Sequence, residues 1–288
     1  MNNNAITWYI SQFPESTFLC SPDKHADYIQ RTLAGRTKMS QSNVLICGIC
    51  RDVEPYLPYT ISRITRLGKM FQGYKVYIYE NDSVDCTKEH LNVWCQNDTN
   101  VTCIQENLDT PKLTEGDVSI ERTRLMADAR NKYLAYARSQ REIQDIDYVI
   151  IIDMDLEGGW SYEGICNSFG YNDWTGIGSN SIYYRKNENA VQRLFFDAWA
   201  YRELGHPEAH KMSHNNLQYF ERGESPIQVN SCFGGLCIYT HEILHERYRY
   251  KSGDCDHPTL NNTLTDNGYK IYMNPSQITL YNRTRYYV

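Results

Sequence analysis

Apolar and polar positions follow two different periods between Asn43 and about Leu156. Short apolar runs, typical of buried strands, are separated by stretches with apolar residues every three to four positions, typical of helices. Strands are predicted at Val44–Cys50, Tyr74–Glu80, Val101–Glu106 and Asp147–Asp153. Helices are predicted between them at Glu54–Met70, Asp85–Cys95 and Glu121–Gln140. This alternation predicts an α/β fold, with a mainly parallel central sheet flanked by helices on both faces.

The remainder of the chain has a less regular pattern. Residues 1–42 are mixed and polar, and we interpret them as an N-terminal extension with a short helix near Asp27–Leu33. Beyond residue 156, helices are predicted at Leu194–Glu203 and Asn215–Arg222. Strands are predicted within Trp174–Tyr184 and within Ile227–Glu242, where Gly234 and Gly235 interrupt the run. A helix, a glycine stop and a short strand ending at Pro275 are predicted for the segment from Pro258.

Composition places the chain among globular proteins. It has 288 residues, of which 41% are hydrophobic and 22% charged, and its formal net charge is −6. Mild acidity argues against binding to nucleic acid or to an anionic membrane, whose phosphates need a basic surface. No apolar run approaches the roughly 20 residues that span a bilayer, and the first residues lack the features of a signal peptide. We therefore expect a soluble, cytoplasmic protein with no membrane span.

Ten cysteines could form five disulfides, but reduced thiols are the better expectation in a chain without an export signal. Cys47, Cys50, Cys232 and Cys237 lie in or beside apolar, strand-like segments, where a free cysteine acts as a small hydrophobic residue. Cys47 and Cys50 also form a CxxC motif. Because they lie within a predicted strand, they should face opposite ways, and we expect neither redox activity nor a zinc site.

Polar side chains gather where the four predicted strands end. They are Arg51-Asp52, Glu80-Asn81-Asp82, Glu106-Asn107 and Asp153-Met154-Asp155. In open α/β sheets, ligands bind beyond the carboxyl ends of the strands. The sequence therefore predicts a binding site along this edge of the sheet.

Asp153 and Asp155 carry the most specific chemistry at that edge. Residues i and i+2 of a strand share a face, so the two carboxylates should project together while Met154 points into the core. Adjacent carboxylates repel each other unless a cation lies near them, and Mg²⁺ or Mn²⁺ prefers such oxygen ligands and bridges them to phosphates. The pair predicts a metal that binds a nucleotide diphosphate. The alternative is that one aspartate caps a turn and the other is solvated.

Three segments in this order resemble the GT-A class of nucleotide-sugar glycosyltransferases: YENDSVDCT at 79–87, ADARN at 127–131 and DMD at 153–155. The combination looks closest to fungal capsule-associated mannosyltransferases and their microbial and viral relatives. The resemblance covers residues 43–160, and only scattered pieces match beyond them. It implies a GT-A-like domain at 43–288, with a nucleotide-sugar-binding half at 43–156 and an acceptor-binding half at 157–288.

The resemblance also implies roles for individual residues. Cofactor or nucleotide contacts are implied for Arg51, Glu80, Asp82, Arg130 and Asp153, and metal ligation for Asp153, Asp155 and His257. Each has a structural alternative. Glu80 could stabilise the start of the following helix, Arg130 could form a surface salt bridge, and His257 could be an ordinary residue at the start of a helix.

The function implied is the metal-dependent transfer of a sugar from a nucleotide diphosphate sugar to a glycan hydroxyl, in polysaccharide or glycan biosynthesis. Mn²⁺ or Mg²⁺ is the implied cofactor, GDP-mannose the leading donor and a UDP-sugar the next. An inverting reaction needs a general base, for which Asp256 and Asp197 are the candidates, but the resemblance favours retention. Two alternatives stay open: a nucleotidyltransferase, although the expected glycine-rich phosphate loop is missing after the first strand, and a non-catalytic carbohydrate-binding protein.

Overall fold

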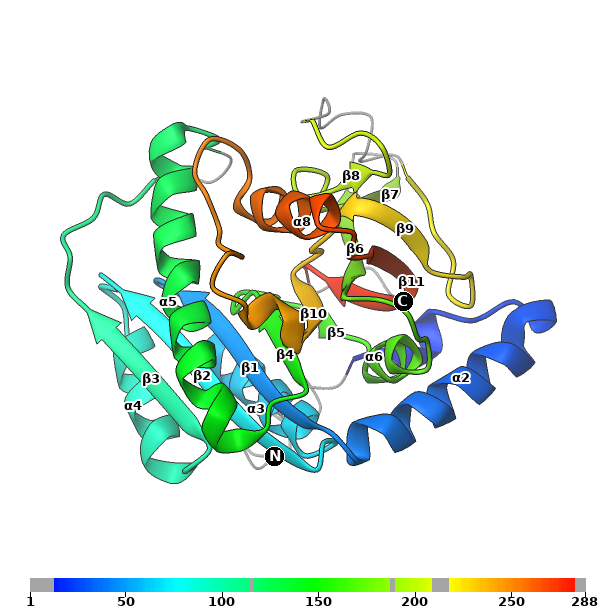
Figure 1. The fold of residues 1–288 in the computed structure, drawn as a ribbon, viewed down its shortest axis with the longest axis horizontal. Coiled ribbons are helices and arrows are strands. Elements are labelled where there is room, and N and C mark those ends of the chain that lie inside the picture. Colours follow the sequence, from blue (N-terminus) through cyan, green and yellow to red (C-terminus); the bar gives the residue numbers. More distant parts are fainter. Residues whose placement is uncertain (1–12, 114–116, 187–189, 209–217, 283–288) are drawn as a thin grey trace.

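The computed structural model describes residues 13–113, 117–186, 190–208 and 218–282. One mixed sheet runs through these residues, with helices on both of its faces (Figure 1). Its strand order is β3-β2-β1-β4-β10-β6-β11-β9-β8, while β5 pairs with β11 and β7 pairs with β6. The predicted α/β class is therefore confirmed.

The first four strands form the parallel part of the sheet. They are β1 (Asn43–Cys50), β2 (Gly73–Asn81), β3 (Val101–Glu106) and β4 (Tyr148–Ile152). All three pairings among them are parallel, so their carboxyl ends lie along one edge. The sequence predicted each of these strands to within two residues at either end.

The later strands make the rest of the sheet mixed. They are β5 (Gly159–Trp160), β6 (Gly176–Lys186), β7 (Val191–Phe195), β8 (Arg202–Glu203), β9 (Ile227–Ser231), β10 (Leu236–Thr240) and β11 (Ile271–Leu280). β10 pairs antiparallel with both β4 and β6, whereas β11 pairs parallel with β6. β11 thus lies inside the sheet, although it is the last described strand in the chain.

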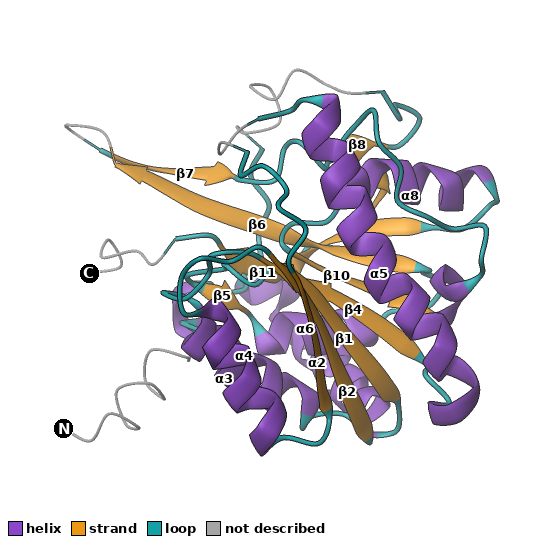
Figure 2. Cartoon of the chain, turned by 90° about the vertical axis from the view of Figure 1, so that its left-hand side faces the viewer, coloured by secondary structure: helices purple, strands orange, loops and turns teal. Residues whose placement is uncertain are grey.

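The helices divide between the two faces of the sheet (Figure 2). One face carries α5 (Ile120–Gln144), α8 (Asp256–Asp266) and the short η2 (His241–Leu244). The other carries α2 (Pro22–Ser40), α3 (Leu57–Gly68), α4 (Thr87–Asn97) and α6 (Tyr162–Phe169). Each face has its own cluster of buried apolar side chains, so β1 and β4 are covered on both sides. A short η1 (Glu15–Thr17) precedes α2.

α2 packs closely against α6 and is longer than the helix predicted at Asp27–Leu33. A Cβ atom on Gly35 would lie 1.8 Å from the backbone oxygen of Cys166, so only glycine allows the two helices to approach this far. Tyr28 is buried on the same side and its hydroxyl donates a hydrogen bond to Glu163 (3.3 Å). Residues 22–40 therefore form part of the packed body of the protein.

Three predictions for the second half were wrong. The segment Leu194–Glu203, expected as a helix, contains the end of β7, a turn and β8. The described part of the other expected helix, 218–222, is not helical, and residues 215–217 lie outside the described residues. Strand β11 also continues past Pro275 to Leu280, by way of a register shift between Asn274 and Ile278.

All ten cysteines are free thiols, as the sequence predicted. Cys47 and Cys50 are buried in β1, and burial raises the pKa of both thiols. The CxxC motif therefore lacks the reactive thiolate of a redox site. In the described ranges, no helix is both long and apolar enough to cross a membrane.

Candidate functional site

The carboxyl edge of the parallel strands is built around a loop that follows β3. Asp82, with a positive φ of 60°, accepts backbone hydrogen bonds from Leu108 (2.6 Å), Asp109 (3.0 Å) and Thr110 (3.1 Å). Burial opposes ionisation of Asp82, but these hydrogen bonds and those from side chains lower its pKa below the usual range. Arg51 donates to the backbone oxygen of Thr110 (3.1 Å). Both predicted nucleotide contacts therefore also hold the loop in place.

Glu80 is the deepest acidic group at this edge, with no exposed surface. Its Oε1 accepts a hydrogen bond from the backbone N–H of Ser83 (2.7 Å), which matches the structural alternative of stabilising the turn before α4. Its Oε2 is buried and has no hydrogen-bond partner among the described residues. A buried carboxylate oxygen without a partner is costly, so a ligand group that donates to Oε2 would bind favourably.

Asp153 lies directly beyond β4 and is held from three sides. Its backbone N–H donates to Gly235 (2.9 Å), Tyr281 donates its hydroxyl hydrogen to Oδ2 (3.0 Å), and Arg130 donates to Oδ1 (3.4 Å). The Asp153 side chain is 21% exposed, whereas Asp155 is exposed at the surface. The two carboxylates thus lie in a turn after the strand, with Met154 buried between them as predicted.

Arg130 is a buried cation on α5, and its predicted alternative as a surface salt bridge is wrong. Its side chain is 3% exposed and forms ion pairs with Asp153 and, at close range, with Asp256 at the start of α8. The guanidinium also lies over the rings of Phe233 (5.2 Å) and Tyr250 (5.9 Å). Arg130 therefore joins α5, β4 and α8 at one point.

His257 is buried beside this ion pair. Its ring stacks on Phe233, with 3.6 Å between the ring centroids, and its Nε2 lies 3.9 Å from Oδ2 of Asp256. Burial and the nearby Arg130 hold the pKa of His257 well below its ordinary value, so the imidazole is neutral. Neither ring nitrogen has a hydrogen-bond partner among the described residues.

Asp153, Arg130, Asp256 and His257 form a cluster, and Asp197 reaches it from the turn after β7. Its Oδ2 accepts a hydrogen bond from the backbone N–H of Gly234 (2.7 Å). Gly234 and Gly235 both have positive φ, 66° and 76°, and a Cβ on Gly235 would lie 2.9 Å from the hydroxyl oxygen of Tyr281. The glycine pair therefore forms a turn that lets Asp153, Asp197 and Tyr281 come close together.

The pKa values of the carboxylates in the cluster are shifted in different directions. Burial, with repulsion from Asp155 and Asp197, raises the pKa of Asp153 to about 7, although Arg130 opposes the shift. Burial likewise raises the pKa of Asp197 to about 7. Burial would also raise the pKa of Asp256, but Arg130 outweighs it and holds that pKa below the usual range. Asp197 is therefore able to take up a proton near neutral pH, and Asp256 is not.

The turn that carries Asp155 is fixed from behind by α3. Thr60 donates to the backbone oxygen of Met154 (3.0 Å), and the buried Arg63 donates to those of Leu156 (2.8 Å) and Glu157 (3.0 Å). Hydrogen bonds from a charged donor to carbonyl groups are stronger than neutral ones. The turn is thus held in one conformation by interactions that are themselves shielded from water.

The donor set fits a hard divalent cation in part. Asp153 and Asp155 offer carboxylate oxygens at the edge of the site, and Mg²⁺ or Mn²⁺ commonly binds one or two carboxylates with waters and phosphates completing its shell. His257 lies behind the Arg130–Asp256 ion pair, and in the described parts of the chain no three His, Cys, Asp or Glu side chains form a preformed metal cluster. The predicted ligation by His257 would therefore need a rearrangement.

Sequence reasoning missed Tyr281, Phe233 and Arg63, which all touch or support the cluster. Tyr281 follows β11, beyond the proline at which that strand was expected to stop. Arg63 lies at a buried position of α3 (2% exposed), where the apolar spacing of the neighbouring leucines and isoleucines was the only available signal.

No family model matches the sequence, and no curated protein matches it either. Among solved structures, the fold is similar to that of the mannosyltransferase PcManGT from Pyrobaculum calidifontis in complex with GDP-Man and Mn²⁺. The TM-score is 0.49 at 12% identity, over 92% of this chain and 68% of that one. A second similar structure is GalNAc-T7 with UDP, GalNAc and Mn²⁺, with a TM-score of 0.48 at 10% identity, over 84% of this chain and 44% of that one.

Both likenesses concern the path of the backbone, and this chain spans less than half the length of GalNAc-T7. The finer resemblance, to fungal capsule-associated mannosyltransferases, stays a prediction.

Proposed function

We propose that this chain is a metal-dependent glycosyltransferase that moves a sugar from a nucleotide diphosphate sugar to a hydroxyl group of a glycan. The observation that carries the proposal is the position of Asp153. Its carboxylate is held by Arg130 and Tyr281 at the carboxyl edge of four parallel strands, beside the exposed Asp155. Ligands of open α/β sheets bind at this edge.

Charge at the site supports binding of a divalent cation with a diphosphate. Asp153 interacts electrostatically with Asp155 and Asp197, Asp197 interacts with Asp256, and the cation Arg130 acts on Asp153, Asp197 and Asp256. The excess of negative charge would favour Mn²⁺ or Mg²⁺ at Asp153 and Asp155. When bound, such an ion would neutralise the charge that develops on the leaving diphosphate.

The nucleoside would lie along the same edge, toward β2. Glu80 Oε2 is the buried acceptor without a protein partner, and ribose hydroxyls or ring N–H groups are donors that suit it. Arg51 and Asp82 hold the 108–111 loop over this edge and would shape the nucleoside pocket. GDP-mannose remains the leading donor on the resemblance, with a UDP-sugar next.

Retention of anomeric configuration remains our proposal, on the same resemblance. If the reaction inverts instead, Asp197 is the better candidate for the general base. Asp197, with its pKa raised to about 7, could accept the proton of the acceptor hydroxyl in an inverting reaction, whereas Asp256 is neutralised by Arg130. The anomeric configuration of the first-formed product, read by NMR against that of the donor, separates the two.

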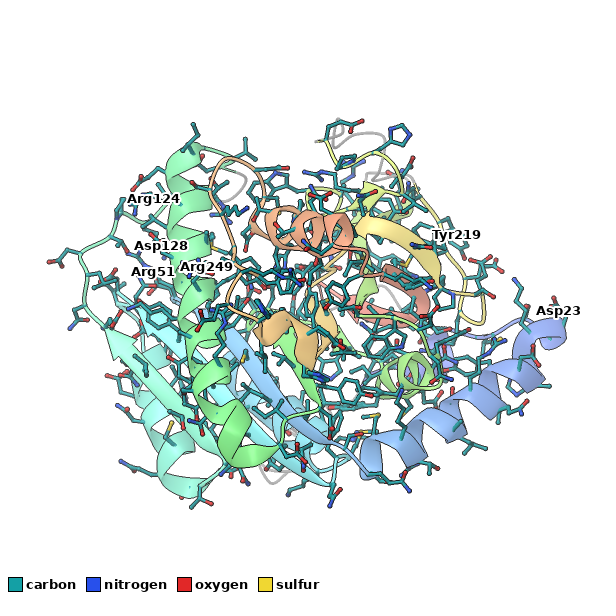
Figure 3. The ribbon with its side chains drawn as sticks, in the orientation of Figure 1. Asp23, Arg51, Arg124, Asp128, Tyr219 and Arg249 are labelled. Atoms are coloured by element: carbon teal, nitrogen blue, oxygen red, sulfur yellow. The ribbon has the colours of Figure 1, made fainter. Side chains whose placement is uncertain are left out.

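The test of the function is the release of nucleoside diphosphate from a panel of nucleotide sugars, with Mn²⁺ or with excess EDTA. We expect release that EDTA abolishes. Asp155→Ala should abolish it as well, while replacement of an exposed aspartate on α2, Asp23→Ala (Figure 3), should leave it unchanged. Full activity in EDTA would show the metal assignment to be wrong.

The alternatives have distinct outcomes in the same assay. A nucleotidyltransferase would instead release pyrophosphate from nucleoside triphosphates, using the same aspartates. A carbohydrate-binding protein would bind sugars and turn over neither substrate.

A further inference from the structure

An exposed aromatic ring lies beside the candidate site and contacts it through one intermediate residue. Phe196 is 40% exposed, and its ring lies over that of Tyr281, with 3.7 Å between the centroids and 30° between the planes. Tyr281 in turn donates its hydroxyl hydrogen to Asp153 (3.0 Å). The ring of Tyr183 lies 5.6 Å from that of Phe196. Phe196 and Tyr281 therefore connect the solvent to the carboxylate at the centre of the site.

Backbone hydrogen bonds fix the position of Phe196. Its N–H donates to the backbone oxygen of Ser181 (3.1 Å), and its own oxygen accepts from the N–H of Ala198 (2.9 Å). The next residue, Asp197, donates its N–H to the Ser181 side chain (3.0 Å). An exposed ring held in this way presents a surface that loses little conformational freedom when a ligand covers it.

Phe196 and Asp197 are neighbours in the sequence and offer different contacts, an aromatic surface and a carboxylate. Phe196 lies outward on Tyr281, while the Asp197 carboxylate turns inward to the N–H of Gly234 (2.7 Å). Sugar rings have apolar C–H faces, which pack on aromatic rings, and hydroxyl edges, which donate to carboxylates. A stacking ring next to carboxylates is thus complementary to a pyranose.

β6 and β7 form the hairpin that carries this ring, and they extend outward beyond the body of the sheet (Figure 2). The ring lies at the inner end of β7, where the hairpin meets the site. The nucleoside side, around Glu80 and Asp82, is formed by the ends of β2 and β3. In the sheet, β6 and β2 are separated by β10, β4 and β1. The hairpin side is therefore available to the other substrate.

We propose that Phe196 and Tyr281 form the acceptor platform, on which a pyranose ring of the acceptor glycan stacks with a hydroxyl group directed toward Asp197 and Asp153. This rests on the proposed function, since it assigns the second substrate of the same site. It identifies the acceptor as a sugar rather than an apolar lipid or a peptide side chain.

The experiment measures acceptor binding and donor turnover separately. Saturation-transfer NMR with methyl α-mannoside and methyl β-galactoside reports binding to the platform and needs no activity. Release of nucleoside diphosphate without acceptor, where water takes the sugar, reports the donor half. Transfer to the same glycosides, at varied concentration, gives KM for the acceptor.

Phe196→Ala should raise the acceptor KM by about five- to tenfold, the scale expected for one stacked ring. It should also weaken saturation transfer, and it should lower donor hydrolysis by clearly less than it lowers transfer. Phe196→Trp should restore both acceptor readouts. The matched control is Tyr219→Ala, which removes an aromatic ring that is 62% exposed and lies under Arg193 (4.2 Å), and we expect no effect from it.

Several results would overturn the platform. One is an unchanged acceptor KM in Phe196→Ala. Another is an equal loss of donor hydrolysis and transfer in that variant, which would show that the ring has a structural role. The third is an absence of saturation transfer from the wild type to either glycoside. The wild type could hydrolyse no nucleotide sugar and still show saturation transfer to the glycosides that Phe196→Ala removes. In that case the platform is supported and the proposed transferase activity is wrong.

Discussion

Replacing Arg130 with methionine tests whether the buried ion pairs organise the site. The guanidinium is 3% exposed and lies between Asp153 and Asp256, whose side chains are 21% and 6% exposed. Methionine keeps much of the volume and the contacts with Phe233, but it leaves both carboxylates without their cation. Breaking a buried pair by removing one partner costs about 3–5 kcal/mol, because the remaining charge is desolvated.

For a domain of this size, about 2 °C is lost per kcal/mol, so we expect the melting temperature of Arg130→Met to fall by about 6–10 °C. The double variant Arg130→Met/Asp256→Asn should recover at least about half of that loss, since it also removes the stranded charge. Nucleotide-sugar turnover should be lost in both variants, because Asp153 has lost its positioning partner.

The loss of stability in Arg130→Met should become smaller as the pH falls. In the wild type the folded-state pKa of Asp256 is lowered, so its stabilising contribution is complete above about pH 4 and is lost only as the pH falls through that lowered value. Without Arg130, burial would raise that pKa above its unfolded value. The variant then gains stability as the pH falls from 7 toward 4, and the gap to the wild type narrows.

Thermal melts and urea unfolding, both followed by tryptophan fluorescence, provide the measurement at pH 7, 6 and 5. The control is Arg124→Met on the same helix. Arg124 is half exposed, pairs with Glu121 and Asp128 at the surface (Figure 3), and should contribute less than about 1 kcal/mol. The reasoning is refuted if Arg130→Met costs no more than Arg124→Met, or if its deficit does not shrink with acidification.

Two further predictions follow from other parts of the structure. Arg63→Met should weaken Mn²⁺-dependent nucleotide binding about tenfold, measured by calorimetry, because the turn that carries Asp155 loses the hydrogen bonds that Arg63 donates to the backbone oxygens of Leu156 and Glu157. Arg63→Lys should retain part of the affinity, and an equal loss in the exposed Arg66→Met would contradict this account. Titration of thiols after unfolding without reductant should find close to ten, since all ten cysteines are free, and five disulfides would contradict it.

The first half of the fold could be predicted because its strands are buried on both faces. Segments such as Val44–Cys50 then appear as uninterrupted apolar runs, and the helices between them keep their own period. The prediction of a helix at Leu194–Glu203 was wrong because the aromatic and apolar residues of this segment fit either a helix or a buried strand. Residues 194 and 195 are in a strand because β7 pairs with β6 in a hairpin, from Lys186 opposite Val191 to Ile182 opposite Phe195. The apolar pattern of the segment alone does not show this pairing.

The candidate site was predictable only where chemistry coincides with a strand end. Asp153 and Asp155 follow a strong apolar run, and Arg130 lies in a segment that resembles a known family. Tyr281 could not be found, because it reaches Asp153 from 128 positions away along a strand that passes a proline. The opposite pKa shifts of Asp197 and Asp256 could not be predicted from the sequence either, because they depend on which carboxylate Arg130 contacts.

The interior position of β11 has a consequence for how the protein is made. Strands β1 to β4 and their helices are complete in sequence by Ile152, so a ribosome could release them as a parallel unit that folds early. β11 is synthesised after every other described strand, yet it must pair with β5, β6 and β9. Until then the edge of β6 stays open, and Tyr281 is missing from Asp153. A nascent chain stalled before Ile271 would therefore combine an unfinished site with an exposed strand edge, which is a substrate for chaperones and a risk of aggregation.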